Sequence, residues 1–335
     1  MSEEPSKVDP MGTDPEDLFR VACRVAVEGV VLPPAIAEAA RGVASRVTSL
    51  SAAKVRGALG TIITAPYLGA GLQWLHEAGV LAYVLPELDA TVNFSQEAGR
   101  RHKDVWEHTK QVVEQSSSDP IVRWSALLHD VGKVKTRKIL PGNKVTFHRH
   151  AEVGARMFDR IARRFEFVED ERQNIRFLIH NHLRANAYEA SWSDGAVRRF
   201  DREMGVHLQR LVELSLADVT SRRPGRKQEA ANNVEALVKR IEALRELDAR
   251  MPPLPPGLGN AIMQAFALPP SRRIGELRQL CEDAVERGDL EERRDADYYL
   301  GYLRTVIETS DGGTASKTEK TTPAPAHAHS DSCDS

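Results

Sequence analysis

The chain has few cysteines, few aromatic residues and almost no net charge. Its 335 residues include 3 cysteines, Cys23, Cys281 and Cys333, which lie far apart and show no CxxC spacing. This usage excludes a disulfide framework and a thiolate metal site, and it predicts free thiols in a reducing compartment. The formal net charge of -2 gives no global attraction to nucleic acid or to membranes. Any contact with a polyanion must therefore come from a local patch.

Long apolar runs are also missing. No run approaches the roughly 18 apolar residues that a membrane-spanning helix needs. Residues 1–13 are acidic and polar, without the apolar centre of a secretory signal. These absences predict a cytoplasmic protein. A composition with 41% hydrophobic and 28% charged residues is that of a globular protein.

Both ends of the chain are predicted to be disordered, at 1–13 and at 310–335. The second segment consists mostly of Ser, Thr, Pro, Ala, Lys and Asp, which cannot bury enough apolar surface to fold. Between these ends, apolar residues recur with helical spacing. Asp14, followed by proline, and Ser51 have the residue types of helix N-caps.

The apolar spacing predicts helices almost throughout. After helices that begin near Asp14 and Ser51, further helices are expected at 69–85, around 105–113, and at 120–131, 149–165, 170–184, 194–203, 206–221 and 228–249. A proline-rich break follows at 251–257, and three short helices then reach Glu308. Only 144–147 alternates like a strand. We therefore predict an all-α fold, an elongated multi-helix body that contains a helical bundle.

Histidines are concentrated in the middle of the chain. Of the 11 histidines, seven lie between His102 and His182. The most informative pair is the adjacent His129-Asp130, within the run Ala126–Lys133, which reads ALLHDVGK. Imidazole and carboxylate groups are ligands for borderline and hard divalent metals. Their position at the ends of apolar stretches predicts a metal site built between helices.

Helical phase separates the close pairs of histidines. A spacing of two residues rotates a side chain by about 200°, so His148 and His150 cannot face one point from the same helix. The same holds for His180 and His182. In each pair the second histidine continues the apolar face of its helix. His148 and His180 are therefore expected to point elsewhere.

Four ionisable residues continue apolar faces in this way: His108, His150, His182 and Asp218. An unpaired polar group in apolar surroundings costs roughly 2–7 kcal/mol, and binding a common cation removes this cost. We expect one metal with the ligands His108, His129, Asp130 and Asp218. His150 and His182 are suited to a second metal.

At these residues the chain resembles the HD-domain metal-dependent phosphohydrolase superfamily, whose signature is a spaced H…HD…D. It is most similar to the neck, HD and tail regions of the bacterial CCA-adding tRNA nucleotidyltransferases and their poly(A) polymerase relatives. The matching stretches are Asp104–Thr109, Ala126–Lys133, Phe147–Ala155, Leu178–Arg184 and Ala217–Ser221. Looser similarity extends over about 14–308. The resemblance implies a neck-like region at 14–96, an HD metal-binding domain at 97–225 and a helical tail region at 226–309.

The resemblance does not extend to the nucleotidyltransferase head. That head carries a Gly-Ser turn and a paired-Asp motif and precedes the neck, whereas here only about 13 residues do so. The neck motif is present in part, as Asp17–Arg20, with Cys23 where a second arginine is expected. We therefore expect that this chain alone does not add nucleotides.

The chemistry that the resemblance implies is metal-dependent hydrolysis of a phosphoester on a nucleotide, a 2′,3′-cyclic phosphate or an RNA end. One or two divalent ions are expected, of Mg, Mn, Ni, Zn or Fe. His150 and His182 would bind the second ion or contact the scissile phosphate, and Lys133 would place a positive charge on it. The implied partners are a nucleotide, an RNA 3′ end or tRNA, with the basic loop Arg222–Lys227 near the site. Neither DNA nor a membrane is expected, and a separately encoded partner stays open.

Two other readings use the same residues. The chain could be a non-catalytic tRNA-binding or RNA-binding module whose metal is structural. The six ligands could also hold the two iron ions of an oxygenase. Loss of RNA binding would argue against the first of these, and a metal content without iron would argue against the second.

Overall fold

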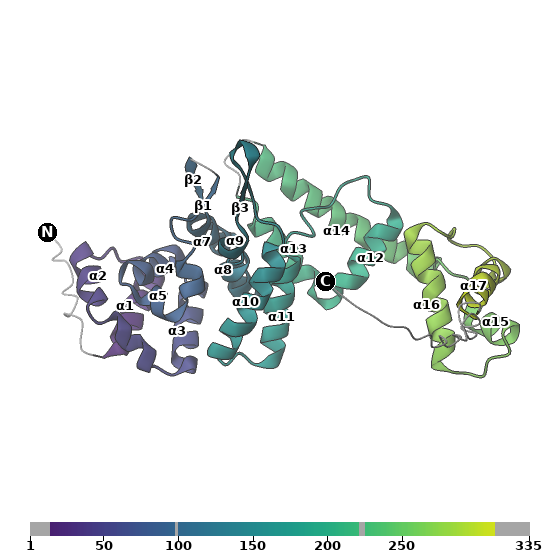
Figure 1. Cartoon of the computed structure of the whole chain (residues 1–335), viewed down its shortest axis with the longest axis horizontal. Coiled ribbons are helices and arrows are strands. Elements are labelled where there is room, and N and C mark those ends of the chain that lie inside the picture. The colour runs from purple at the N-terminus through teal and green to yellow at the C-terminus, as the bar shows by residue number, and fades with distance from the viewer. Residues whose placement is uncertain (1–13, 98–99, 221–224, 312–335) are drawn as a thin grey trace, which may run out of the picture. The chain divides into compact units, whose positions relative to one another are not determined.

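A computed structural model of the chain describes residues 14–97, 100–220 and 225–311. Disorder was predicted for 1–13 and 310–335. Positions 310 and 311 are helical, and the other positions lie outside the described residues, so for them disorder stays a prediction. Contacts divide the chain into two compact units, one built from residues up to 193 with 197–242 and one from 194–196 with the residues after 242. Figure 1 shows the helices and strands, coloured by residue number from purple to yellow.

The first unit begins with a group of short helices. They are α1 (Pro15–Glu28), α2 (Pro34–Arg41), α3 (Ala52–Thr64), α4 (Leu68–Glu77), α5 (Val80–Val84) and α6 (Pro86–Asp89). Asp14 and Ser51 cap α1 and α3 as predicted, because their side chains accept hydrogen bonds from the backbone N–H groups of Glu16 and Lys54. The apolar run 69–85 forms two helices and not one, since the chain turns at Gly79 with a φ of 71°.

A second group of helices completes this unit and carries the histidines. They are α7 (Val105–Gln115), α8 (Pro120–Leu128), α9 (Lys133–Thr136), α10 (His150–Arg164), α11 (Glu169–Asn181) and α13 (Leu208–Ala217), with α12 (Asp194–Met204) and α14 (Arg226–Arg250) beginning or ending in the other unit. Helices α10 and α11 pack against each other, and α8 contacts α7, α11 and α13. The ends of α8, α11 and α13 thus come together.

Two small antiparallel hairpins interrupt the helices. Strand β1 (Ser95–Glu97) pairs with β2 (Arg100–Asp104), and β3 (Lys138–Leu140) pairs with β4 (Lys144–Thr146). The strand expected at 144–147 is thus confirmed, but its partner and the first hairpin were not predicted. Strands β1 and β3 have three residues, too few for alternation to reveal, and the five residues of β2, RRHKD, include no apolar residue. The all-α class is otherwise confirmed.

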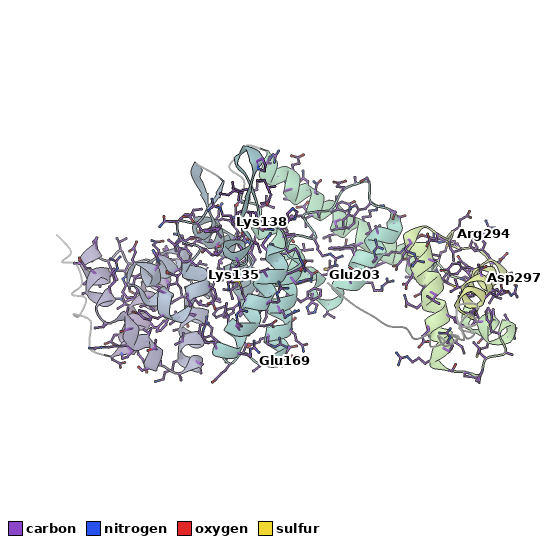
Figure 2. The ribbon with its side chains drawn as sticks, viewed as in Figure 1. Lys135, Lys138, Glu169, Glu203, Arg294 and Asp297 are labelled. Atoms are coloured by element: carbon purple, nitrogen blue, oxygen red, sulfur yellow. The ribbon has the colours of Figure 1, made fainter. Side chains whose placement is uncertain are left out.

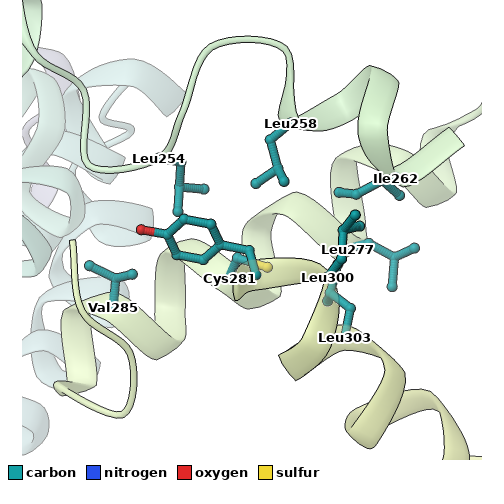
Figure 3. Close-up of a cluster of buried hydrophobic side chains, with 9 residues drawn as sticks. Leu254, Leu258, Ile262, Leu277, Cys281, Val285, Leu300 and Leu303 are labelled. Atoms are coloured by element: carbon teal, nitrogen blue, oxygen red, sulfur yellow. The ribbon is translucent and has the colours of Figure 1, made fainter. Parts of the chain in front are cut away.

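The second unit packs three helices, α15 (Leu258–Ala265), α16 (Arg272–Arg287) and α17 (Ala296–Asp311), around a small apolar core. Figure 3 shows this core, in which Leu277 and Cys281 of α16 lie close to Leu300 and Leu303 of α17. The buried Tyr299 donates a hydrogen bond from its hydroxyl to the backbone carbonyl of Glu291, 2.8 Å away. None of the described helices in the chain is both long and apolar enough to cross a membrane.

Candidate metal centre

Five helices of the first unit place the six predicted ligands in one cluster. His108 lies within α7, and the other ligands lie at helix ends: His129 and Asp130 after α8, His150 at the start of α10, His182 after α11 and Asp218 after α13. Their ligand atoms form two groups that could each hold a metal ion, and all atoms within a group lie within 4.8 Å of one another. We call these six residues the HD cluster.

The first group contains His108, His129 and Asp218. The Nε2 atom of His108 lies 3.0 Å from Oδ1 of Asp218 and 3.3 Å from Nε2 of His129. The distance from Nε2 of His129 to the same Asp218 oxygen is 3.5 Å. Three potential ligand atoms therefore surround a common point.

The second group contains Asp130, His150 and His182. The Nε2 atoms of His150 and His182 are 3.2 Å apart, and Oδ1 of Asp130 lies 3.4 Å from His150. The other oxygen of Asp130, Oδ2, lies 3.4 Å from Nε2 of His108 and 3.3 Å from that of His129. The structure thus places Asp130 between the two groups, whereas the sequence argument assigned it to the first metal alone.

Each of the four imidazoles is held through its Nδ1 atom. His129, His150 and His182 each donate from Nδ1 to the backbone carbonyl three residues earlier, at 2.8, 2.9 and 2.7 Å. The Nδ1 atom of His108 is 2.9 Å from the hydroxyl of Thr220. A carbonyl can only accept, so in neutral His129, His150 and His182 these bonds select the tautomer that leaves the Nε2 lone pair facing the cluster. That is the form in which histidine binds a metal.

Burial makes the cluster costly without a cation. His129 is fully buried, and Asp130 and His182 are only 2% and 1% exposed. Oδ1 of Asp130 is shielded from solvent and has no hydrogen-bond partner among the described residues. Nε2 lone pairs that face each other also repel unless a positive charge lies between them. A divalent cation satisfies both demands, so the residues fit such an ion.

Electrostatics divides the cluster in two. Burial alone would lower the pKa of His129, but the carboxylates of Asp130 and Asp218 outweigh it and raise that pKa to about 10. The pKa of His108 is raised for the same reason. Burial lowers the pKa of His150, and burial together with the charge of His129 lowers the pKa of His182 to about 4. The imidazoles of the first group therefore attract positive charge, and the two imidazoles of the second group stay neutral.

Both carboxylates stay ionised. Burial would raise the pKa of Asp218, but hydrogen bonds from His108 and His129 hold it well below the usual range. Against the same effect of burial, the positive charges of His129 and Lys133 hold the pKa of Asp130 well below its usual range. Helices α8, α11 and α13 also direct their C-terminal ends, which carry partial negative charge, at the cluster. All of these features favour a cation.

Lys133 and Gly132 lie beside the cluster. Lys133 is the first residue of the short helix α9, and its ammonium is 2.6 Å from Oδ2 of Asp130. A Cβ atom at Gly132 would lie 2.1 Å from the carbonyl oxygen of His150 and 2.7 Å from the backbone nitrogen of Gly154. Only glycine therefore allows the start of α9 to approach α10 so closely, and this approach brings Asp130 toward His150.

Two histidines predicted to point elsewhere lie outside the cluster, although His148 precedes α10 and only His180 is turned away by helical phase. His148 and His180 are exposed and do not belong to the HD cluster. Thr220, which holds His108, was missed by the sequence argument, although it lies two residues after Asp218. The repeated bond from a histidine to the carbonyl three positions earlier was also missed. A histidine directly at the end of an apolar helix is the signal that could have indicated it.

Comparisons with known proteins agree with this geometry. Positions 95–244, which contain all six residues of the HD cluster, match the family model described as HD domain. The A-adding tRNA nucleotidyltransferase of Deinococcus radiodurans is 28% identical over 295 residues, which are 84% of this chain and 66% of that protein. The CC-adding tRNA nucleotidyltransferase of Thermus thermophilus is 29% identical over 267 residues, 78% of this chain and 59% of that protein.

A shorter match has higher identity. The multifunctional CCA protein of Alkalilimnicola ehrlichii is 34% identical over 117 residues, 33% of this chain and 27% of that protein. The chain spans less than two thirds of the length of each of these three relatives. The match to the HD domain thus covers 95–244, and similarity to two tRNA nucleotidyltransferases extends over most of the chain.

Proposed function

We propose that the chain is a metal-dependent phosphohydrolase of the HD type. Its substrate would be a phosphoester on a nucleotide, a 2′,3′-cyclic phosphate or an RNA end. One observation carries the proposal: four imidazole Nε2 atoms, the buried carboxylate of Asp130 and the partly buried carboxylate of Asp218 lie together in the HD cluster. We further propose that the neck-like, HD and tail regions divide near 97 and 226, as expected from the sequence.

The ligand chemistry fits a divalent ion of borderline character, because nitrogen and carboxylate oxygen are both present and thiolates are not. His108, His129, Asp130 and Asp218 would hold the principal ion, and Asp130 would share its second oxygen with a site formed by His150 and His182. Such an ion, when bound, lowers the pKa of a water ligand and neutralises phosphoryl oxygens.

The protein groups have separate tasks in this proposal. The Nδ1 bonds fix the ring orientations, so no rearrangement is needed when substrate binds. His182, with a pKa of about 4, stays neutral near pH 7 and keeps its lone pair available. Lys133 supplies a positive charge next to the cluster and can contact a phosphate oxygen. Where a single ion is bound, His150 and His182 would contact the scissile phosphate.

The test is a panel of phosphoesters. Purified protein supplied in turn with Mg²⁺, Mn²⁺, Ni²⁺, Zn²⁺ or Fe²⁺ would be assayed for phosphate release and for opening of 2′,3′-cyclic nucleotides. We expect turnover that a chelator abolishes and that His129→Asn and Asp130→Asn lower by at least about a hundredfold. The matched control is His76→Gln, because His76 pairs with Asp89 outside the cluster. An inert wild-type protein with all metals would contradict the proposal.

A second candidate function is supported by the relatives. Two of them are named as tRNA nucleotidyltransferases and align with 84% and 78% of this chain. The chain would then bind tRNA or another RNA end without hydrolysing it, and its metal would be structural. This function predicts salt-dependent RNA binding that survives His129→Asn. Absence of a gel shift at low salt would exclude it.

A further inference from the structure

In the segment that joins two members of the HD cluster, every Asp, Glu, Lys or Arg position is a cation. Between Asp130 and His150, positions 131–149 contain six Lys or Arg residues and no Asp or Glu. In the whole chain the two signs nearly balance, at 46 Lys and Arg against 48 Asp and Glu. In the fold the segment forms α9 and the β3–β4 hairpin, so it both begins and ends at the proposed metal centre.

Two of these cations are free to meet a ligand. Lys133 and Arg149 are paired with Asp130 and Glu152. Lys135, on α9, and Lys138, at the start of β3, are exposed and have no ion-pair partner among the described residues. Both are labelled in Figure 2. An exposed lysine without a carboxylate partner can contact a phosphate without breaking an existing pair.

A row of cations and aromatic rings connects the cluster to this surface. The Lys133 ammonium lies 5.6 Å from the centre of the Phe147 ring, and that ring lies 6.4 Å from the ring of Phe94. The guanidinium of Arg137 lies 5.2 Å from the centre of the Phe94 ring. The Nε atom of Arg137 is shielded from solvent and has no hydrogen-bond partner among the described residues. A chain of side-chain contacts therefore runs from Lys133, beside the metal centre, to Arg137 at the start of the hairpin.

The hairpin also exposes apolar side chains next to its cations. Ile139 and Leu140 follow Lys138 and are 60% and 42% exposed. A small anion such as inorganic phosphate makes no use of apolar surface. A nucleic-acid strand does, because its bases and sugars stack on apolar and aromatic groups while its phosphates contact cations.

We propose that α9 and the β3–β4 hairpin bind the phosphodiester backbone of a single-stranded RNA end and lead its terminal phosphate to the HD cluster. Lys135 and Lys138 contact phosphates upstream of the reacting one. The substrate is then an oligonucleotide and not a mononucleotide. This assignment rests on the proposed function for the terminal phosphate, but strand binding itself does not require hydrolysis.

The first arm of the test measures binding without turnover. Fluorescent RNA of about 12 nucleotides, ending in a 2′,3′-cyclic phosphate, is titrated by anisotropy in chelator over a range of salt. Since each phosphate contact on a single strand contributes about 0.7 to the slope of log K against log salt, Lys135→Glu/Lys138→Glu should lower the slope by about 1.4 and weaken binding about 25-fold at 0.1 M salt. The control, Arg163→Glu/Lys239→Glu, changes two exposed cations elsewhere on the same unit and should bind like wild type.

The second arm measures turnover of the same RNA and of a nucleoside 2′,3′-cyclic monophosphate with metal. The lysine variant should lose kcat/KM on the RNA and keep it on the mononucleotide. If every protein is inert on both substrates but the binding difference persists, the proposed function fails and the strand surface stands. Equal binding by wild type and the lysine variant, or an equal loss with the control variant, overturns the strand surface. Thermal melting of each variant reports whether it is folded.

Discussion

The substitution Asp130→Asn tests the bridging position of this carboxylate in two ways. In chelator, it removes the negative charge that lies 2.6 Å from the Lys133 ammonium and within 3.4 Å of two Nε2 atoms. The side chains of Lys133 and Asp130 are 12% and 2% exposed, so the pair is largely desolvated. Removing one partner of a buried pair costs about 3–5 kcal/mol.

The expected loss is large enough to be measured by calorimetry. For a domain of 150–250 residues, 1 kcal/mol shifts Tm by about 2–4 °C, so Tm of the first unit should fall by roughly 6–20 °C. The matched control is Glu152→Gln, which removes a partly exposed carboxylate that is paired with Arg149. Such a surface pair contributes at most about 1 kcal/mol.

Metal gives the second readout. A ligand at a thousandfold excess over its Kd stabilises a protein by about 4 kcal/mol, and wild type should gain this much. Because Asp130 faces both groups of ligands, Asp130→Asn should lower the metal bound at both. By contrast, Asp218→Asn should affect only the group that contains His108 and His129. The bridging position of Asp130 would be refuted if Asp130→Asn melted like wild type in chelator and, when supplied with metal, bound as much metal as wild type.

Three further outcomes are expected. In Gly132→Ala, the new Cβ would clash with the backbone of α10 at His150, so metal content and Tm should both fall. Metal analysis and calorimetry measure the two changes, and an unchanged metal content would contradict this. In metal-stripped protein, His182 takes up a proton below pH 6.5 in the unfolded state but only below about pH 4 in the folded state. The free energy of unfolding, measured by urea titration, should therefore fall by about 3 kcal/mol as the pH is lowered from 6.5 to 4, and it should fall less in His182→Leu. Equal pH slopes in the two proteins would argue against this. Burial raises the pKa of the Cys281 thiol to about 11, so it should react with a thiol reagent at pH 8 only after unfolding, and rapid labelling of the folded protein at this residue would contradict that burial.

Much of the centre could be predicted because helical phase is local. The spacing of His150 and His182 from apolar neighbours indicated their direction, and both are buried in the cluster. The same argument separated His180, which is exposed on α11; His148 is exposed too, but it lies before α10 and not on another face of that helix. Capping residues such as Asp14 could also be predicted from the sequence, because a cap depends on the few residues that follow it.

Features that depend on tertiary contacts could not be predicted in this way. The two oxygens of Asp130 face different groups because the start of α9, at Gly132, approaches α10, and no local pattern encodes this approach. Thr220 holds His108 across 112 positions of the chain, which sequence spacing does not show. The β1–β2 hairpin was missed because β1 has only three residues and β2, RRHKD, has no apolar residue that could alternate with its polar ones.

The most direct test of the metal centre is anomalous diffraction from crystals grown with Mn²⁺. We predict anomalous density in the HD cluster, at coordination distances of about 2.0–2.4 Å from Nε2 of His108 and His129 and from Oδ2 of Asp130. A second ion, where present, should lie between Asp130, His150 and His182. A map at millimolar Mn²⁺ with no density among these side chains would contradict the account.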